Sequence, residues 1–432
     1  MTKNFFLILF LIFFNSCSFD TRSGFWTKET KISELNEIEL KKIFAKKEIN
    51  NEELNIDLKV KPNFNTVYLD KENKNNYGPI EENFELEKLS SYKFKKIDYF
   101  DQFEPELVFF QNDLIFFEKN GTIIRFNEKG EIVWKVNHYS KSEKKNNPLL
   151  RFTKIENKIL VSDSFAKFYL IDSENGELIW NSEHKVSFIS QIKIDDDKFF
   201  VLDSNNTLNC FSLVDGKKIW EFKGEYNLIS SKKLTSLIID DNQVIFNNLR
   251  GEIFSLNKKN GNLNWITPVI SYKENIKSFL TKSSDLVLNN KQLLISNNRN
   301  NLYSINSNTG LITWQQNVSS FLRPILIDNL IFLITTNGYL NIIDFEKGNI
   351  IKITDILKNY KIKKRKKIEI VGFIISKEKI LVSTSIGHLI LVDLESGLST
   401  KILKISRGKI SKPYVNDKNL YIIKDNQIIK MN

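Results

Sequence analysis

Few residues of this sequence belong to the types that bind metals or attack substrates. Its 432 residues include three histidines, His138, His184 and His388, and two cysteines, Cys17 and Cys210. So few nitrogen and sulfur ligands argue against a zinc cluster or an iron–sulfur site. His138 and His184 each follow a repeated tryptophan by four residues, which indicates equivalent structural positions and not a catalytic pair. Cys210 lies in an apolar run, which predicts a small core residue and not a nucleophile.

Three adjacent carboxylates at Asp195–Asp197 could suit calcium, because hard cations prefer oxygen ligands. The corresponding place in other repeats is a polar turn, as at Asp240–Asn242 and Asn416–Lys418. We therefore interpret the three aspartates as a turn, with a calcium site as the alternative. The sequence contains 16 glycines and no glycine-rich phosphate loop.

Basic residues exceed acidic ones by a modest margin. Lysine and arginine total 63 against 52 aspartate and glutamate, a net charge of +11 that is spread over the chain. Nucleic-acid binders concentrate such an excess, so we expect no nucleic-acid partner. The densest run, Lys358–Lys367, is a basic loop that could attract anionic lipid headgroups or an acidic partner, or be a solvated insertion.

A glycine followed four residues later by tryptophan recurs along most of the chain. The copies that keep tryptophan are Gly130–Trp134, Gly176–Trp180, Gly216–Trp220, Gly261–Trp265 and Gly310–Trp314. Two degenerate copies follow, Gly348–Lys352 and Gly397–Lys401, in which lysine replaces tryptophan. From Gly130 to Gly397 there are 267 residues in six intervals, a mean of 44.5, and this period is typical of a four-stranded propeller blade.

Short β runs and polar turns precede each glycine, for example Lys198–Leu202 and Thr207–Phe211. An Asp or Asn four residues before the glycine, as at Asp172 and Asn257, can cap the hairpin while the glycine takes a positive φ. Tryptophan repeated at one strand position predicts a flat anchor packed between neighbouring blades. This structural role is expected for Trp134, Trp180, Trp220, Trp265 and Trp314.

The number of blades follows from the length of the repeated region. Residues 92–432 are 341 residues, and division by 44.5 gives about 7.7, which favours eight blades over seven. The last blade, around Asn419–Met431, has no Gly–Trp ending, so we expect Tyr92–Tyr99 to complete it and to remove its exposed edge. The predicted fold is all-β, an eight-bladed β-propeller of four-stranded blades over residues 92–432.

The N-terminus has the form of an export signal. Lys3 precedes the apolar run Phe5–Phe14, which as a helix would be about 15 Å long, too short to span a bilayer. A small residue and then Cys17 follow, a pattern that resembles a bacterial lipoprotein signal. In such a signal residues 1–16 are removed and Cys17 is acylated; ordinary cleavage nearby is the alternative. Ser18, in place of aspartate, favours the outer membrane in that sorting pattern.

Residues 17–91 do not fit the repeat and are rich in lysine, glutamate and asparagine. We interpret them as a partly disordered tether between the lipid and the propeller. A short amphipathic helix at Ile32–Phe44 is the alternative within this segment.

The order of lipoprotein signal, tether and Gly–Trp repeats resembles the BamB family, propeller lipoproteins of the outer-membrane β-barrel assembly machinery. The resemblance covers residues 92–432 and implies a non-enzymatic scaffold without a cofactor, on the periplasmic side of the outer membrane. It implies as partners the barrel subunit BamA, other assembly lipoproteins and unfolded outer-membrane proteins. The repeat also marks quinoprotein oxidoreductases that bind pyrroloquinoline quinone, so such an enzyme, or a small-ligand-binding propeller, is the alternative.

The resemblance also implies where the barrel subunit would bind. In the BamB family the contacts come from loops that correspond here to Glu225–Leu234 and Ser278–Asp285. The arginine expected near Ser230 and the paired aspartates expected near Leu280 and Lys282 are missing from this sequence. The candidate partner-binding residues are Ile229, Ser230, Lys232, Leu280 and Lys282.

Overall fold

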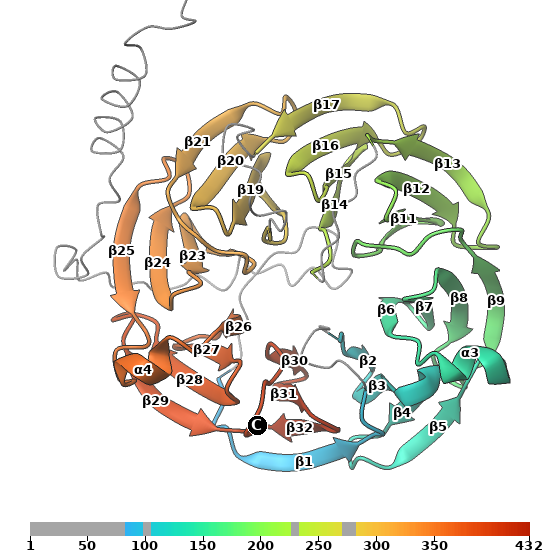
Figure 1. The fold of residues 1–432 in the computed structure, drawn as a ribbon, viewed down its shortest axis with the longest axis horizontal. Helices are drawn as coiled ribbons and strands as arrows, with labels where there is room; N and C mark the ends of the chain where they lie inside the picture. Colours follow the sequence, from blue (N-terminus) through green and yellow to red (C-terminus); the bar gives the residue numbers. More distant parts are fainter. Residues whose placement is uncertain (1–82, 98–104, 226–232, 270–281) are drawn as a thin grey trace, which may run out of the picture. The chain divides into compact units, whose positions relative to one another are not determined.

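The computed structural model describes residues 83–97, 105–225, 233–269 and 282–432. The predicted signal peptide, Cys17 and most of the predicted tether lie outside the described residues. The described chain forms eight antiparallel sheets of four strands each, arranged as the blades of a ring (Figure 1). The prediction of an all-β, eight-bladed propeller is therefore confirmed.

The first four blades follow the sequence without interruption. Blade 1 contains β2 (Val108–Phe110), β3 (Asp113–Glu118), β4 (Thr122–Phe126) and β5 (Ile132–Val136), with the short helix η4 (Lys119–Gly121) between β3 and β4. Blade 2 contains β6 (Leu150–Ile155), β7 (Lys158–Asp163), β8 (Lys167–Asp172) and β9 (Leu178–Glu183). Blade 3 contains β10 (Lys193–Asp195), β11 (Lys198–Leu202), β12 (Thr207–Ser212) and β13 (Lys218–Lys223). Blade 4 contains β14 (Leu237–Asp240), β15 (Gln243–Asn247), β16 (Glu252–Asn257) and β17 (Leu263–Pro268).

The last four blades continue the ring, and the eighth combines an N-terminal strand with the three C-terminal strands. Blade 5 contains β18 (Val287–Asn289), β19 (Gln292–Asn297), β20 (Asn301–Asn306) and β21 (Ile312–Gln316). Blade 6 contains β22 (Ile325–Ile327), β23 (Leu330–Ile334), β24 (Tyr339–Asp344) and β25 (Ile350–Asp355). Blade 7 contains β26 (Ile370–Ile375), β27 (Lys379–Thr384), β28 (His388–Asp393) and β29 (Ser399–Lys404). Blade 8 contains β30 (Tyr414–Asn416), β31 (Asn419–Lys424), β32 (Gln427–Met431) and β1 (Lys88–Lys93).

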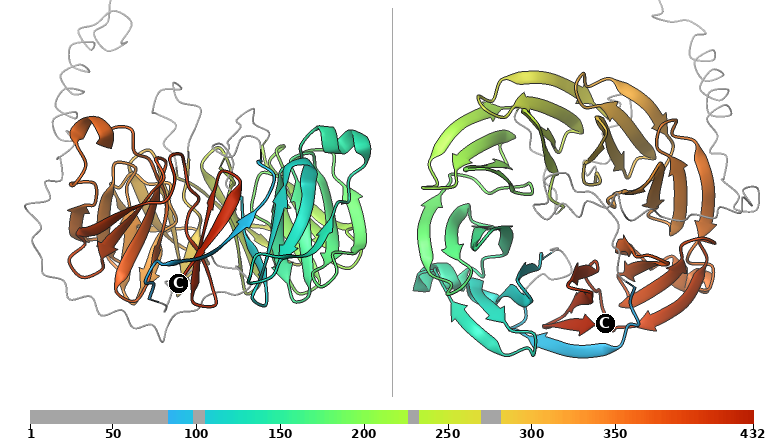
Figure 2. Two further views of the ribbon diagram at one scale, coloured as in Figure 1. Left: turned by 90° about the horizontal axis from the view of Figure 1, so that it is seen from below. Right: turned by 180° about the vertical axis from the view of Figure 1, so that it is seen from behind.

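Blades 1 to 7 run from the centre of the ring to its rim in sequence order, and blade 8 has the N-terminal strand β1 at its rim (Figure 1). Because a blade has four antiparallel strands, its first strand begins and its fourth strand ends on the same face of the ring. The described ends of the connections between blades therefore lie on one face of the ring, which we call the connection face. The helices α3 (Lys141–Lys145) and α4 (Ile362–Arg365) lie in two of these connections and stand on the same side of the ring in Figure 2.

The middle strands of each blade are covered on both faces by neighbouring blades. Four successive residues of β11 after its first are buried, and β12 has only its last residue partly exposed. This double coverage explains why the strands form continuous apolar runs instead of alternating ones. One core cluster shows the packing directly, because it joins Leu160 and Phe168 of blade 2 to Phe199 and Phe211 of blade 3.

The repeated turn follows the predicted chemistry. Asp172 accepts hydrogen bonds at its side chain from the backbone N–H groups of Glu174 and Asn175, at 2.7 and 3.2 Å. Gly176 donates its own N–H to the Asp172 carbonyl at 3.0 Å and has a φ of 76°. That conformation is inexpensive only for glycine, so the residue that marks the repeat is required by the backbone of the turn.

The ring is closed by an N-terminal strand, as the missing end of the last repeat predicts. β1 pairs antiparallel with β32, and it forms the outermost strand of blade 8. The strand spans Lys88–Lys93 and so begins earlier than the Tyr92–Tyr99 segment expected to close the ring. Its first residues were overlooked because an outermost strand faces solvent and needs no apolar run. Among the described residues, no helix is long and apolar enough to cross a membrane.

Candidate functional site

The five repeated tryptophans lie on the outer strands of blades 1 to 5 and reach across to the next blade. Each indole Nε1 donates a hydrogen bond, 2.9–3.3 Å long, to a backbone carbonyl in the repeated turn of the next blade. The pairs are Trp134 with Ser173, Trp180 with Leu213, Trp220 with Lys258, Trp265 with Ser307 and Trp314 with Phe345. We call this arrangement the tryptophan contact.

Each tryptophan ring also covers the repeat glycine of the next blade. A Cβ on Gly261 would lie 2.7 Å from a ring atom of Trp220, closer than real Cβ atoms approach their neighbours. The glycine is thus needed both for its φ of 74° and for the space that the ring occupies. Where lysine replaces tryptophan, Lys352 donates from Nζ to the Glu395 carbonyl of the next blade at 3.1 Å.

The histidines and Cys210, which could in principle act in catalysis, each have a separate structural contact and do not form a shared site. His138, His184 and His388 contact the Gly176 carbonyl, the Asp203 carboxylate and the Tyr360 hydroxyl, respectively, at 2.8–3.0 Å. Burial raises the pKa of the Cys210 thiol to about 12, so it stays protonated at neutral pH.

Of the three aspartates weighed as calcium ligands, Asp196 and Asp197 form a turn, whereas Asp195 ends β10 and pairs with Lys258 at 2.6 Å. In the described residues, no three His, Cys, Asp or Glu side chains gather in a way that could hold a metal ion. The basic run carries α4, where Arg365 pairs with Asp355 at 2.6 Å.

The two candidate partner-binding loops are described only at their ends. Ile229, Ser230, Lys232 and Leu280 lie outside the described residues. Lys282 is described: it is exposed, and its Nζ lies 5.2 Å from the centre of the Phe321 ring. The first loop follows β13 of blade 3 and the second follows β17 of blade 4, so both leave from the connection face of neighbouring blades.

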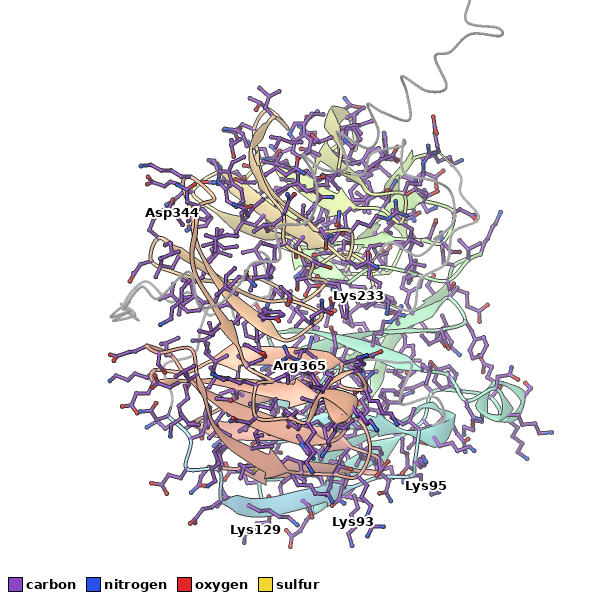
Figure 3. The ribbon with its side chains drawn as sticks, turned by 60° about the vertical axis from the view of Figure 1, so that its left-hand side comes forward. Lys93, Lys95, Lys129, Lys233, Asp344 and Arg365 are labelled. Atoms are coloured by element: carbon purple, nitrogen blue, oxygen red, sulfur yellow. The ribbon has the colours of Figure 1, made fainter. Side chains whose placement is uncertain are left out.

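Lys233 ties the ends of these loops together, and it lies toward the middle of the molecule in Figure 3. Its Nζ donates to the Ser283 carbonyl at 2.7 Å and also to the Phe321 carbonyl, which belongs to the connection before blade 6. It lies 3.8 Å from the Asp285 carboxylate. One lysine therefore joins the connections that precede blades 4, 5 and 6.

The charge around Asp285 is dominated by cations. Burial opposes the ionisation of this carboxyl, but four positive neighbours outweigh it and hold the pKa of Asp285 below its usual value. The four are Lys233, Lys412, Arg323 and Lys193. Asp285 is therefore ionised at neutral pH and anchors the cationic side chains near it.

The sequence profile of the family described as outer membrane protein assembly factor BamB matches residues 119–354, more than half of the chain. This chain belongs to the BamB family. The match begins after β3 of blade 1, includes all five repeated tryptophans and ends in β25 of blade 6, where Lys352 takes the tryptophan position. No curated protein sequence matches the chain.

Solved structures agree with the BamB family in the fold. The crystal structure of BamB from Moraxella catarrhalis has a TM-score of 0.66 and 14% sequence identity, over 80% of this chain and 100% of that chain. A europium-containing methanol dehydrogenase has a TM-score of 0.65 and 11% identity, over 86% of this chain and 91% of that chain. The computationally designed Ika8 protein has a TM-score of 0.60 and 11% identity, over 80% of this chain and 99% of that chain. At such identities the similarity shows the fold alone.

The described centre of the ring does not fit a site for pyrroloquinoline quinone and calcium. An acidic calcium site needs several oxygen ligands around one ion. Among the described residues that line the pocket at this centre, only Glu106 and Asp285 are carboxylates, and four cationic side chains accompany them. The sequence also lacks the adjacent cysteine pair of such enzymes, since its cysteines are Cys17 and Cys210.

Sequence reasoning missed the side chains at the centre of the connection face, including Phe321, Arg323 and Lys412. Arg323 and Lys412 each stand two residues before the first strand of a blade, and Glu106 and Asp285 occupy the same place in their blades. This repeated position, two residues before a blade's first strand, is the sequence signal that could have predicted side chains at the centre of the ring. It was weak because the residue type differs from blade to blade.

Proposed function

We propose that this chain is a non-enzymatic scaffold lipoprotein of the outer-membrane β-barrel assembly complex. It binds a BamA-like barrel subunit through the connection face of blades 4 to 6, and it works beside the other lipoproteins of that complex on unfolded outer-membrane proteins. The observation that carries the proposal is the 2.7 Å hydrogen bond from Lys233 Nζ to the Ser283 carbonyl. Since these residues lie near the C-terminal ends of the two candidate loops, those described ends lie together on the face.

The chemistry beside these loops suits a protein partner. Phe321 is half-buried, and the Nζ atoms of Lys233 and Lys282 lie 6.0 and 5.2 Å from the centre of its ring. An aromatic ring held between cations offers apolar area with little mobility, and aromatic residues contribute strongly at protein interfaces. The proposal therefore assigns Phe321 the apolar contact and Lys282 the charged rim.

Replacing Phe321 by alanine is expected to weaken capture of the purified barrel subunit about tenfold, because truncation of a central aromatic contact costs more than 1 kcal/mol. Lys282→Glu should mainly slow association, most visibly at low salt, because exposed charges act through screened attraction. Surface plasmon resonance measures both rate constants. Lys401→Glu, an equal charge change at an exposed site on β29, is the control.

The loop positions predicted from the sequence, Ile229 and Leu280, provide a second pair of variants. A bulky charge introduced at Ile229 or Leu280 is expected to weaken capture as well, whereas neutralising Lys363–Lys367 should act less strongly and mainly at low salt. If folded Phe321→Ala and Leu280→Glu proteins bind like the wild type, while neutralising the basic run abolishes capture, the surface has been assigned to the wrong part of the ring.

We propose that acylated Cys17 anchors the protein in the periplasmic leaflet of the outer membrane. The Cys17→Ala variant is expected to leave the membrane fraction while its melting temperature stays unchanged, because the acyl group lies outside the propeller core. Fractionation followed by thermal unfolding of the propeller measures both. Membrane retention of the alanine variant, after washing that removes the barrel subunit, contradicts the lipid anchor.

The proposal includes the absence of an enzymatic activity. Purified protein supplied with calcium and pyrroloquinoline quinone is expected to reduce no dye with alcohol substrates and to develop no cofactor absorbance. The reason is the poor fit of the described centre to that group. Dye reduction that requires both additions contradicts the scaffold proposal and favours a quinoprotein oxidoreductase.

A further inference from the structure

The centre of the connection face contains a charged pocket that borders the surface proposed for the barrel subunit and shares Phe321 and Lys233 with it. Its cavity has a volume of about 90 Å³. Six charged side chains line it: Glu106, Arg151, Lys233, Asp285, Arg323 and Lys412. Four cations against two carboxylates leave a net charge of +2 among these lining residues.

The cations come from separate blades and converge on the pocket. Arg151 lies in β6 of blade 2, Lys233 precedes blade 4, Arg323 precedes blade 6 and Lys412 precedes blade 8. Blades 2, 4, 6 and 8 are distributed evenly around the ring. The positive charges therefore surround the axis instead of forming a patch on one side.

Two of the cations already have protein partners. Arg151 donates from Nη1 to the Phe188 carbonyl at 2.8 Å, and burial lowers its pKa to about 10, which leaves it charged at neutral pH. Lys233 donates to two carbonyls and lies 3.8 Å from Asp285. Carbonyl groups stabilise these cations without neutralising them.

The other two cations, Arg323 and Lys412, have fewer hydrogen-bonding or ionic partners at the pocket. Within the described parts of the chain, Arg323 forms no side-chain hydrogen bond and no ion pair shorter than 4 Å. Lys412 Nζ lies 5.5 Å from the centre of the Tyr414 ring. Gly372 of blade 7 lets Lys412 approach, because a Cβ at this glycine would lie 2.5 Å from the Cβ of Lys412. The backbone is thus arranged to admit Lys412.

Like charges that converge in a partly buried cavity repel one another strongly. The reason is that the surrounding protein, from which water is partly excluded, screens charges less than bulk water does. Asp285 and Glu106 relieve part of this repulsion, but these two carboxylates face four cations. A bound anion removes the remaining repulsion. The pocket therefore has both the charge and the partly buried position that favour an anion site.

We propose that this pocket binds a small, multiply charged oxyanion, held by Arg323 and Lys412 and surrounded by Arg151 and Lys233. The volume is several times the roughly 10–15 Å³ that one water molecule needs, so a small anion fits in place of solvent. The planar guanidinium of Arg323 can bind two oxygens of a phosphate or carboxylate group at once. The ligand chemistry is thus a phosphate group or a cluster of carboxylates.

Titration calorimetry on the full propeller tests the site, with inorganic phosphate and citrate as separate ligands at one fixed ionic strength. Saturable binding is expected for at least one of them. Tighter binding of phosphate identifies a phosphoryl ligand, and tighter binding of citrate identifies a carboxylate ligand. Chloride at the same ionic strength is expected to compete only weakly, because it carries one charge and lacks the paired oxygens that a guanidinium binds.

The double variant Arg323→Gln and Lys412→Gln is expected to bind at least tenfold more weakly. The matched control, Lys363→Gln and Lys364→Gln in α4, removes the same charge outside the pocket and should stay within twofold of the wild type. Arg323→Lys keeps the charge without the forked donor and should bind with intermediate affinity, which separates recognition from misfolding. Absence of saturable binding to the wild type, or equal weakening in the control, overturns the proposal. Capture of the barrel subunit is measured separately on the same variants, because Arg323 and Lys412 lie outside the two candidate loops.

Discussion

Tyr92→Ala is expected to lower the free energy of unfolding by about 3–5 kcal/mol, the range for truncating a buried aromatic side chain. Tyr92 is 1% exposed, and its ring lies 5.7 Å from that of Phe126 in blade 1 and 6.3 Å from that of Tyr421 in blade 8. Its hydroxyl donates to the Glu128 carbonyl at 3.3 Å. The side chain therefore closes the ring between its first and last blades.

The control for this experiment lies in the same strand. Leu89 is 53% exposed, so Leu89→Ala should change stability by less than about 0.5 kcal/mol. Tyr92→Phe, which removes only the hydroxyl, should cost about 1 kcal/mol. Denaturant unfolding followed by tryptophan fluorescence measures all three variants. Equal stability of Tyr92→Ala and Leu89→Ala would mean that β1 does not hold the ring closed.

The tryptophan contact provides the second large effect. Trp220→Ala is expected to cost about 3 kcal/mol, because it removes a large ring from the boundary between blades 3 and 4 together with its hydrogen bond to the Lys258 carbonyl. Gly261→Ala should also destabilise the protein, since the new Cβ would lie 2.7 Å from the ring and the residue would keep a φ of 74°.

The two substitutions must interact if the ring and the glycine share one space. In the Trp220→Ala background the clash disappears, so Gly261→Ala should cost at least about 1 kcal/mol less than in the wild type. Part of its cost should persist because the positive φ remains. Gly408→Ala is the matched control, since a Cβ there meets no atom within 4 Å. Additive costs in the double-mutant cycle would show that the ring does not require the glycine.

The tryptophan contact has equivalents at positions that have lost tryptophan. At the closure of the ring, Tyr92 bonds to the carbonyl of Glu128, which follows Asn127 just as Ser173 follows Asp172. At the end of blade 6, Lys352 bonds to a carbonyl two residues beyond Asp393. A long donor at this strand position, more than the indole itself, is what these blade boundaries have in common.

The sequence by itself determined the blades and their number. The turn is a local structure, in which an Asp or Asn caps the chain and a glycine takes a positive φ, so its residues recur wherever a blade ends. The interval between such turns is the length of one blade, and the length of the repeated region then gives eight. Closure by an N-terminal segment also followed, because the last repeat lacked its final strand.

The exact position of the closing strand needed the tertiary structure. β1 begins at Lys88, among polar residues that face solvent on the rim, and an exposed outer strand leaves little apolar pattern to recognise. Only the pairing of Tyr92 with Ile428 of β32 fixes its register. The backbone partner of an edge strand is set by the completed ring and not by the strand's own residues.

The central pocket was decided by the tertiary structure alone. Glu106, Arg151, Asp285, Arg323 and Lys412 are separated by tens of residues, and each reads locally as an ordinary charged residue near the start of a strand. They meet because a propeller places the beginning of every first strand around one axis. Burial, repulsion and net charge at that axis depend on the side chains of several blades at once, and no single repeat contains that information.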